Sequence, residues 1–187
     1  MVLPSAYLPP ISWFASLKTG EPIFIEQHEH YLKQTIRNRC TIDSPNGQLH
    51  LSIPIDKGNF VSGKCLMKDV RISTHSDWQR QHWYAIETSY FKSPFFEYLQ
   101  DDFRPIYEQQ WTFLMDFNEA LIHQCLELLD LHPLLSRTDT YLGTFAGHPS
   151  PAITPYYQVF RHKHGFLPDL SIIDLIFNMG LESILYI

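Results

Sequence analysis

A short polar stretch contains the residues best suited to bind an anion. Arg37 and Arg39 flank Asn38, and Gln34 lies just before them. A guanidinium group presents a rigid fork of N–H donors that fits a carboxylate or a phosphate. On a strand, Arg37 and Arg39 point to one face and Asn38 points to the other. This pattern predicts a clamp for a small anionic molecule. The alternative is a structural ion pair with one of three acids: Glu26, Glu29 or Asp174.

Asp174 and Asn178 are polar positions in an otherwise apolar segment near the C-terminus. Their spacing places both side chains on one face of a helix. A carboxylate buried there without a partner costs several kcal/mol, so Asp174 must meet a cation, a group of donors or a ligand. We expect Arg37 or Arg39 to be that partner, in an active site or in a structural tie between the tail and the body of the protein.

His82 lies on an aromatic stripe. Trp78, His82, Ile86 and Tyr90 recur at a regular interval that is typical of one helix face. The ordinary pKa of histidine, about 6.5, lies near neutral pH. His82 is therefore a candidate general base, and Trp78 is a candidate substrate contact. The alternative is a core histidine whose ring is satisfied by one carbonyl group.

Two His-x-His pairs are candidate metal ligands, His28 with His30 and His162 with His164. Side chains two residues apart on a strand point the same way, so either pair could hold a metal. No third ligand follows at a metal-site spacing, and we predict no metal. We expect His28 and His30 instead to line a pocket at the carboxyl end of a strand, with His28 as a candidate catalytic residue. The chain has no GxGxxG, phosphate loop or GxSxG motif, and we assign no cofactor.

Composition and charge narrow the class of protein. The 187 residues are 44% apolar and 18% charged, as in a globular domain. A net charge of -6 with one tight arginine pair argues against nucleic acid as a partner. Three scattered cysteines without a CxxC motif indicate a reducing compartment. Since neither a signal peptide nor a long apolar run is evident, we expect a cytoplasmic protein without a membrane span. Its oligomeric state is open.

The first half of the chain is predicted to be rich in strands. We expect strands at residues 2–7, 22–26, 38–42, 48–53 and 70–72, and a helix at residues 11–17. The order strand, helix, strand at the start predicts two parallel strands. Pro45-Asn46-Gly47 has the composition of a tight turn, so the third and fourth strands should form an antiparallel hairpin.

The second half is predicted to be helical. We expect helices at residues 76–90, 94–109, 112–131 and 171–178, and an irregular connection at residues 132–155. Ser76 and Gln79 have the spacing of a capping box, Pro105 should kink or break its helix, and Ser171 should cap the last one. The pattern predicts an α/β fold, with a small mixed sheet that begins as a parallel βαβ unit and contains an antiparallel hairpin. No boundary divides the chain, and we expect a single domain over residues 1–187.

Six stretches of the chain recur together in one known family. They are Tyr7-Leu8-Pro9 with the aromatic segment after it, residues 33–39, residues 51–55, Trp78 with His82-Trp83, Pro94-Phe95-Phe96, and residues 170–180. In this order they resemble the WbqC-like family. Two features mark a short variant: Leu3, Pro4 and Ser5 stand where many members have His-Gln-Pro, and the chain is shorter between Arg137 and Pro155.

The resemblance implies a function. Members are bacterial cytoplasmic proteins found with surface-polysaccharide (O-antigen) genes, and a glycine-transfer role is suggested for some. The resemblance therefore implies an enzyme of that or related metabolism, an aminoacyl (glycine-type) transferase. In that hypothesis the arginines hold an anionic group, His82 or His28 moves a proton, and Asp174 orients one of them. The alternative is a non-catalytic small-anion-binding or scaffold protein that keeps the fold.

Overall fold

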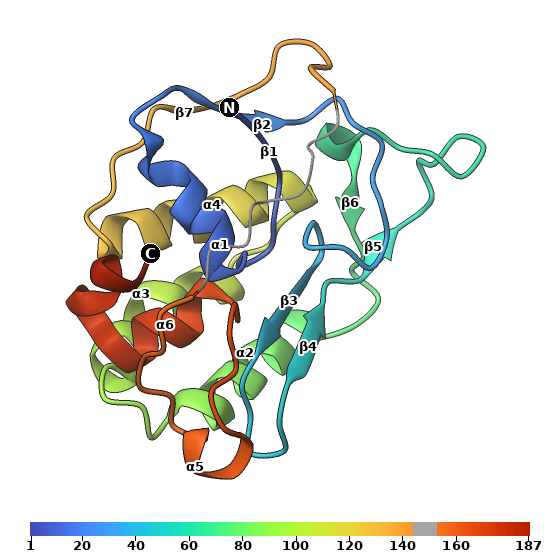
Figure 1. Ribbon diagram of the computed structural model, residues 1–187. Helices are drawn as coiled ribbons and strands as arrows, with labels where there is room; N and C mark the ends of the chain where they lie inside the picture. The colour runs from blue at the N-terminus through green and yellow to red at the C-terminus, as the bar shows by residue number, and fades with distance from the viewer. Residues whose placement is uncertain (144–152) are drawn as a thin grey trace.

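Three short parallel strands organise the first part of the fold (Figure 1). The computed structural model describes residues 1–143 and 153–187. Strands β1 (Val2–Pro4), β2 (Ile23–Glu26) and β7 (Leu135–Arg137) form one parallel sheet in the order β1-β2-β7. Helix α1 (Ile11–Ala15) and the 3-10 helix η1 (Ser16–Thr19) connect β1 to β2, so the predicted parallel start is confirmed.

Strand β7 lies in the segment that we predicted as an irregular connection. It is three residues long, and its sequence Leu-Ser-Arg is too short to show an alternating pattern. The strand exists because β2 offers a free edge: the Ile23 amide donates to the Leu134 carbonyl at 2.8 Å, and the Thr138 amide donates to the Ile25 carbonyl at 3.0 Å. Residues 144–152 of the predicted connection lie outside the described part of the chain.

The predicted hairpin is confirmed. Strands β3 (Arg39–Ile42) and β4 (Leu49–Ser52) pair in antiparallel fashion as a two-stranded sheet. Gly47 in the turn has a φ of 102°, which glycine adopts without steric cost, and its amide donates to the Ser44 carbonyl at 3.0 Å. A second small antiparallel pair, β5 (Ile55–Asp56) with β6 (Arg71–Ile72), follows the hairpin, with the 3-10 helix η2 (Met67–Asp69) between its strands.

Three helices follow in sequence: α2 (Trp78–Tyr90), α3 (Phe96–Glu108) and α4 (Leu114–Leu128). The predicted capping box at the start of α2 is wrong. Asp77, not Ser76, precedes α2, and no side chain caps that end. Helix α3 continues through Pro105, so the predicted break does not occur, and a kink there stays a prediction. Because Pro105 has no N–H, the Asp101 carbonyl has no amide partner in the helix. Both residues are exposed, so water can hydrate this carbonyl.

The C-terminal segment supplies a buried helix. After the short helix α5 (Arg161–His164), helix α6 (Ile172–Met179) contacts α1, α3 and α4 and leads into the 3-10 helix η3 (Gly180–Tyr186) (Figure 1). Its residues are apolar on nearly all sides, which explains why it is buried. The Ser171 side chain does not cap α6 as predicted; its hydroxyl donates to the Leu8 carbonyl at 2.8 Å.

The architecture confirms the predicted α/β class, with a parallel start, an antiparallel hairpin and helices in the second half. One apolar cluster joins these parts, and its largest fully buried side chains include Trp13, Phe14, Phe117 and Phe177. Among the described helices, none has the length and apolar character needed to cross a membrane.

Candidate functional site

A pocket of about 200 Å³ lies where the segment after β1, the start of β3 and the segment before α6 meet. We call it the Arg39 pocket. Its walls are formed by eight residues: Leu8, Pro10, Ile36, Arg39, Cys40, Thr41, Asp169 and Ser171. Pockets for drug-sized ligands span roughly 300–1,000 Å³, so this one suits a smaller molecule.

Backbone hydrogen bonds hold the walls of the Arg39 pocket together. The Tyr7 amide donates to the Ile36 carbonyl, and the Ser171 amide donates to the Thr41 carbonyl, both at 2.8 Å. The Ile172 amide donates to the Pro9 carbonyl at 2.9 Å. Because each wall is tied to another by its main chain, the pocket is formed before a ligand arrives, which lowers the entropic cost of binding.

Two residues that line the pocket have a strained backbone. The φ angles of Leu8 and Asp169 are 39° and 53°, in the left-handed region that side chains with a Cβ disfavour. Aspartate tolerates this region better than leucine does. Such conformations cost about 1–3 kcal/mol each and gather at binding and active sites. Their presence in one pocket favours it as the candidate site.

Two opposite charges line the pocket without pairing with each other. Arg39 Nε donates to Ser52 Oγ at 2.9 Å, and its guanidinium forms no ion pair with a described carboxylate. The Asp169 carboxylate accepts the Ser12 amide and the Ser12 hydroxyl, both at 2.8 Å, and forms no ion pair with a described cation. Arg39 thus lines the pocket without a bound counter-charge among the described residues, and its role as an anion contact stays a prediction.

Arg37 has a different environment. Its Nε and Nη2 atoms donate to the two carboxylate oxygens of Glu29 at 2.7 and 2.5 Å, and both residues are buried. Strand β3 begins only at Arg39, so the two arginines do not share a strand face as we expected. Arg37 instead forms the structural ion pair that was the alternative. Of the other predicted contacts, Asn38 Nδ2 donates to the Ile53 carbonyl at 3.0 Å, and Gln34 is exposed with a φ of 59°.

Asp174 is bound by neutral donors, so the prediction that an arginine is its partner is wrong. The hydroxyl groups of Tyr90 and Tyr156 donate to it at 2.9 and 2.6 Å, and the Gln158 amide donates at 3.1 Å. Neutral donors satisfy the carboxylate without the cost of burying a second charge. Burial raises the pKa of Asp174 to about 6, although these hydrogen bonds act in the opposite direction. Asn178 Nδ2 donates to the Asp174 carbonyl at 2.7 Å and thus supports the helix backbone.

His82 belongs to a buried chain of polar groups. Its Nδ1 lies 2.9 Å from the Tyr7 hydroxyl, which lies 2.8 Å from the Tyr107 hydroxyl. Burial lowers the pKa of His82 to about 4, although a hydrogen bond to the Ser52 backbone raises it. The ring is therefore neutral at neutral pH, and its Nδ1 is hydrogen-bonded. Trp78 packs edge-on against it, with ring centroids 5.2 Å apart.

Buried polar side chains also gather at the carboxyl ends of the parallel strands. Glu26 ends β2, and its Oε1 accepts the His28 amide at 2.7 Å and the Thr138 hydroxyl at 2.9 Å. His28 lies next to the end of β2, and its Nε2 is buried without a hydrogen-bond partner among the described residues; the pocket expected there stays a prediction. Asn118 of α4 reaches the same edge, where its amide donates to Ser5 Oγ at 3.0 Å and to the Arg37 carbonyl at 2.8 Å.

Sequence reasoning missed Asp169, Thr41 and Asn118. A usable signal existed for Asn118, which interrupts the apolar face of the helix between Leu114 and Leu121. Thr41 lies two residues after Arg39 in the predicted strand, so the pattern placed it on the same face. No pattern in the sequence marks Asp169, because its position depends on a contact with Ser12, far away in the chain.

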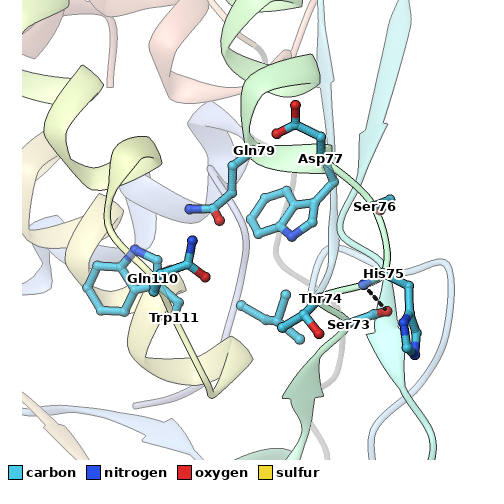
Figure 2. A pocket seen from close by; sticks show the side chains of 10 residues that line it. Ser73, Thr74, His75, Ser76, Asp77, Gln79, Gln110 and Trp111 are labelled. Carbon is cyan, nitrogen blue, oxygen red and sulfur yellow. Dashed lines mark hydrogen bonds between the residues drawn. The ribbon is translucent and has the colours of Figure 1, made fainter.

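A larger pocket of about 350 Å³ lies at the start of α2 (Figure 2). Figure 2 shows the amide groups of Gln79 and Gln110 turned toward each other beside the Trp111 ring. Of the predicted site residues, Trp78 lines this pocket. Its one acidic side chain, Asp77, is exposed and pairs with Arg80 at 2.5 Å. This pocket offers hydrogen bonds but no unpaired charge, so we prefer the smaller Arg39 pocket as the candidate site.

The His-x-His pairs lie apart from this site. His30 is exposed and forms an isolated β-bridge with Leu66, and His162 is exposed on α5. Within residues 1–143 and 153–187, no three His, Cys, Asp or Glu side chains lie close enough together to hold a metal ion.

Comparison with known proteins identifies the family. The sequence profile of the WbqC-like protein family matches residues 5–153, which is most of the chain. The chain belongs to the WbqC-like protein family. Two walls of the Arg39 pocket, at residues 8–10 and 36–41, lie within the part matched by the WbqC-like profile, and the third follows it.

One curated relative is the uncharacterised protein Rv1507c of Mycobacterium tuberculosis. It is 24% identical over 221 aligned residues, which cover 97% of this chain and 94% of the relative. Because the alignment is longer than the 187 residues of this chain, the mycobacterial protein has segments that this WbqC-like chain lacks. No solved structure matches the chain significantly.

Proposed function

We propose that this protein binds a small anionic molecule in the Arg39 pocket. The observation that supports the proposal is the contrast between two neighbouring arginines. Glu29 neutralises Arg37 in a buried ion pair, whereas the half-buried Arg39 guanidinium lines a pocket and forms no ion pair with a described carboxylate. A partly desolvated guanidinium attracts an anion more strongly than an exposed one does, because less water screens the charge.

Binding without catalysis is favoured by where the predicted catalytic groups lie. His82 and Asp174 are buried in their own hydrogen-bond networks, and His28 lies at the end of β2. None of the three is among the residues that line the Arg39 pocket. A general base must come within hydrogen-bond reach of the proton that it removes, directly or through one water molecule.

A thermal-shift screen with Arg39→Gln tests this proposal. We expect a screen of simple anions and small aminoacyl compounds to include at least one that raises the melting temperature of the wild type. Arg39→Gln should lose that shift. Arg161→Gln is the matched control, because Arg161 is exposed on α5 and is not part of the pocket. Equal shifts for the wild type and Arg39→Gln with every hit would exclude an anion site at Arg39.

An aminoacyl-type transferase of surface-polysaccharide metabolism is the second candidate. One observation favours it: Thr41 Oγ1 lies 2.9 Å from His50 Nδ1, and Thr41 lines the Arg39 pocket. Thr41 and His50 are direct cross-strand partners in the hairpin. A hydroxyl next to an imidazole is the arrangement of a nucleophile with its base. In this reading the Thr41 hydroxyl attacks an acyl carbonyl, His50 accepts the hydroxyl proton, and the leaving group departs from the acyl donor.

An activated ester tests the second candidate. After incubation with p-nitrophenyl acetate, a transferase of this kind gains the mass of one acetyl group on Thr41 in peptide mass spectrometry. Thr41→Val and His50→Gln should each abolish that modification. Its absence from the wild type, or its persistence in His50→Gln, would count against a nucleophilic threonine and leave the binding proposal untouched.

A further inference from the structure

Asp169 brings a negative charge into the same small pocket as Arg39. The two residues come from different walls, since Arg39 begins β3 and Asp169 precedes α6. Each is held by its own serine, Arg39 by Ser52 and Asp169 by Ser12. They share a pocket of about 200 Å³ and still form no ion pair with each other. The fold therefore holds two opposite charges apart on the walls of one cavity.

Both charged groups keep binding capacity. A carboxylate has roughly four acceptor positions, and Asp169 uses two of them on Ser12. A guanidinium has about five N–H donors, and Arg39 uses one on Ser52. The positions left over can bind a ligand without breaking the contacts that hold the side chains in place.

A simple anion uses only half of this arrangement. An anion bound to Arg39 would be repelled by the nearby Asp169 carboxylate, which would stay without a cation. A ligand with both signs of charge satisfies the two groups together. The remaining walls include the aliphatic side chains of Leu8, Pro10 and Ile36, which suit a short carbon chain between the charges.

We infer that the ligand of the Arg39 pocket is a small zwitterion, with an ammonium group a few bonds away from a carboxylate or a phosphate. The inference rests on the proposed function: Arg39 binds the anionic group, and Asp169 binds the ammonium. Two sources supply this chemistry, an α-amino acid with its carboxylate and an aminoalkyl phosphate with its phosphate. The pocket is too small for a nucleotide-sized ligand.

Isothermal titration calorimetry on the intact chain tests the inference with five probes: acetate, inorganic phosphate, methylammonium, L-alanine and O-phosphoethanolamine. We expect at least one zwitterion to bind tenfold more tightly than the simple anion that shares its anionic group. The zwitterion with the larger advantage identifies the source. Asp169→Asn should abolish that advantage without weakening the binding of acetate or phosphate. Arg39→Gln should weaken the binding of all four probes that carry an anionic group, the two zwitterions included.

The wild-type comparison decides the matter even where Asp169→Asn fails to fold. Equal affinities of L-alanine and acetate, together with equal affinities of O-phosphoethanolamine and phosphate, overturn the zwitterion inference. If Arg39→Gln still weakens acetate or phosphate, the anion site of the proposed function survives that result. If none of the five probes binds the wild type, the inference and the proposed function both fail.

Discussion

At the scale of single residues, identical side chains take different roles because their partners differ. Arg37 and Arg39 lie two positions apart, yet Arg37 is locked to Glu29 and Arg39 faces a pocket. A buried charge that loses its partner has neither water nor a counter-ion, and this is costly. The ion pair therefore fixes Arg37 in a structural role and leaves Arg39 as the guanidinium for a ligand.

Glu29→Gln should lower the free energy of unfolding by about 3–5 kcal/mol, because it leaves Arg37 charged and buried. Urea denaturation followed by circular dichroism measures the loss. Glu97→Gln is the control; Glu97 is exposed on α3, and its replacement should change stability by less than about 0.5 kcal/mol. If both variants are equally stable, the ion pair does not carry the structural role assigned to it.

Asp174 makes stability depend on pH in a defined direction. Its pKa is raised from 3.8 to about 6 in the folded state, so the folded protein holds this proton more tightly than the unfolded chain does. The stabilisation is complete below about pH 4 and is lost as the pH rises through 6. Compared with Asp174→Asn, the wild type should therefore gain on the order of 3 kcal/mol between pH 7 and pH 4. Parallel stability curves for the two proteins would show that Asp174 does not titrate in this range.

At the scale of elements, the sequence predicts the strands and helices that a local residue pattern controls. It misses the elements and contacts that depend on residues far away in the chain. The hairpin follows from alternation around a Pro-Asn-Gly turn, and α6 follows from an apolar run that ends at Gly180. Strand β7 is too short to have a pattern, and it exists only through β2. The partners of Asp174 were mispredicted for a similar reason. A sequence shows that a buried carboxylate needs donors, but the donors Tyr90 and Tyr156 are brought to it by the tertiary fold.

The end of α6 gives a test of an element boundary. Gly180 has a φ of 56°, and a Cβ placed there would lie 2.6 Å from the Phe95 ring. Gly180→Ala should destabilise the protein by about 2 kcal/mol, since it combines backbone strain with a clash against the exposed Phe95 ring. Gly20→Ala separates the two effects. Gly20 has a φ of 73° but no atom within 4 Å of the added Cβ, so it should cost only about 1 kcal/mol. Thermal unfolding that ranks the two variants in the opposite order would refute this description of the α6 end.

At the scale of the whole molecule, two buried groups change the stability of the fold with pH in opposite directions. His82 has its pKa lowered from 6.5 to about 4, so the folded state resists protonation. Its contribution is present above about pH 6.5 and is lost as the pH falls toward 4. The stabilising contribution of Asp174 grows as the pH falls through nearly the same range, so the two contributions offset each other in the wild type.

Replacing one of these groups should uncover the other. His82→Gln removes the histidine titration, so this variant should become more stable by on the order of 3 kcal/mol, relative to the wild type, as the pH falls from 7 to 4. Asp174→Asn should show the opposite trend. The two variants can be compared by urea unfolding at a series of pH values. If the free energy of unfolding relative to the wild type changes with pH in the same direction for both variants, the two contributions do not offset each other.

The fold as a whole brings three distant segments to the Arg39 pocket and joins them by main-chain hydrogen bonds. Those segments, at residues 8–10, 36–41 and 169–171, overlap three of the stretches on which the resemblance to the WbqC-like family depends. The single-domain organisation over residues 1–187 stays a prediction.

The most direct test of the central claim is to map the binding of inorganic phosphate onto the backbone amides by NMR spectroscopy. Anion binding at Arg39 predicts saturable shifts that cluster at residues 8–10, 36–41 and 169–171 and disappear in Arg39→Gln. Shifts that instead cluster at the start of α2, around the pocket in Figure 2, or that persist in Arg39→Gln, would contradict it.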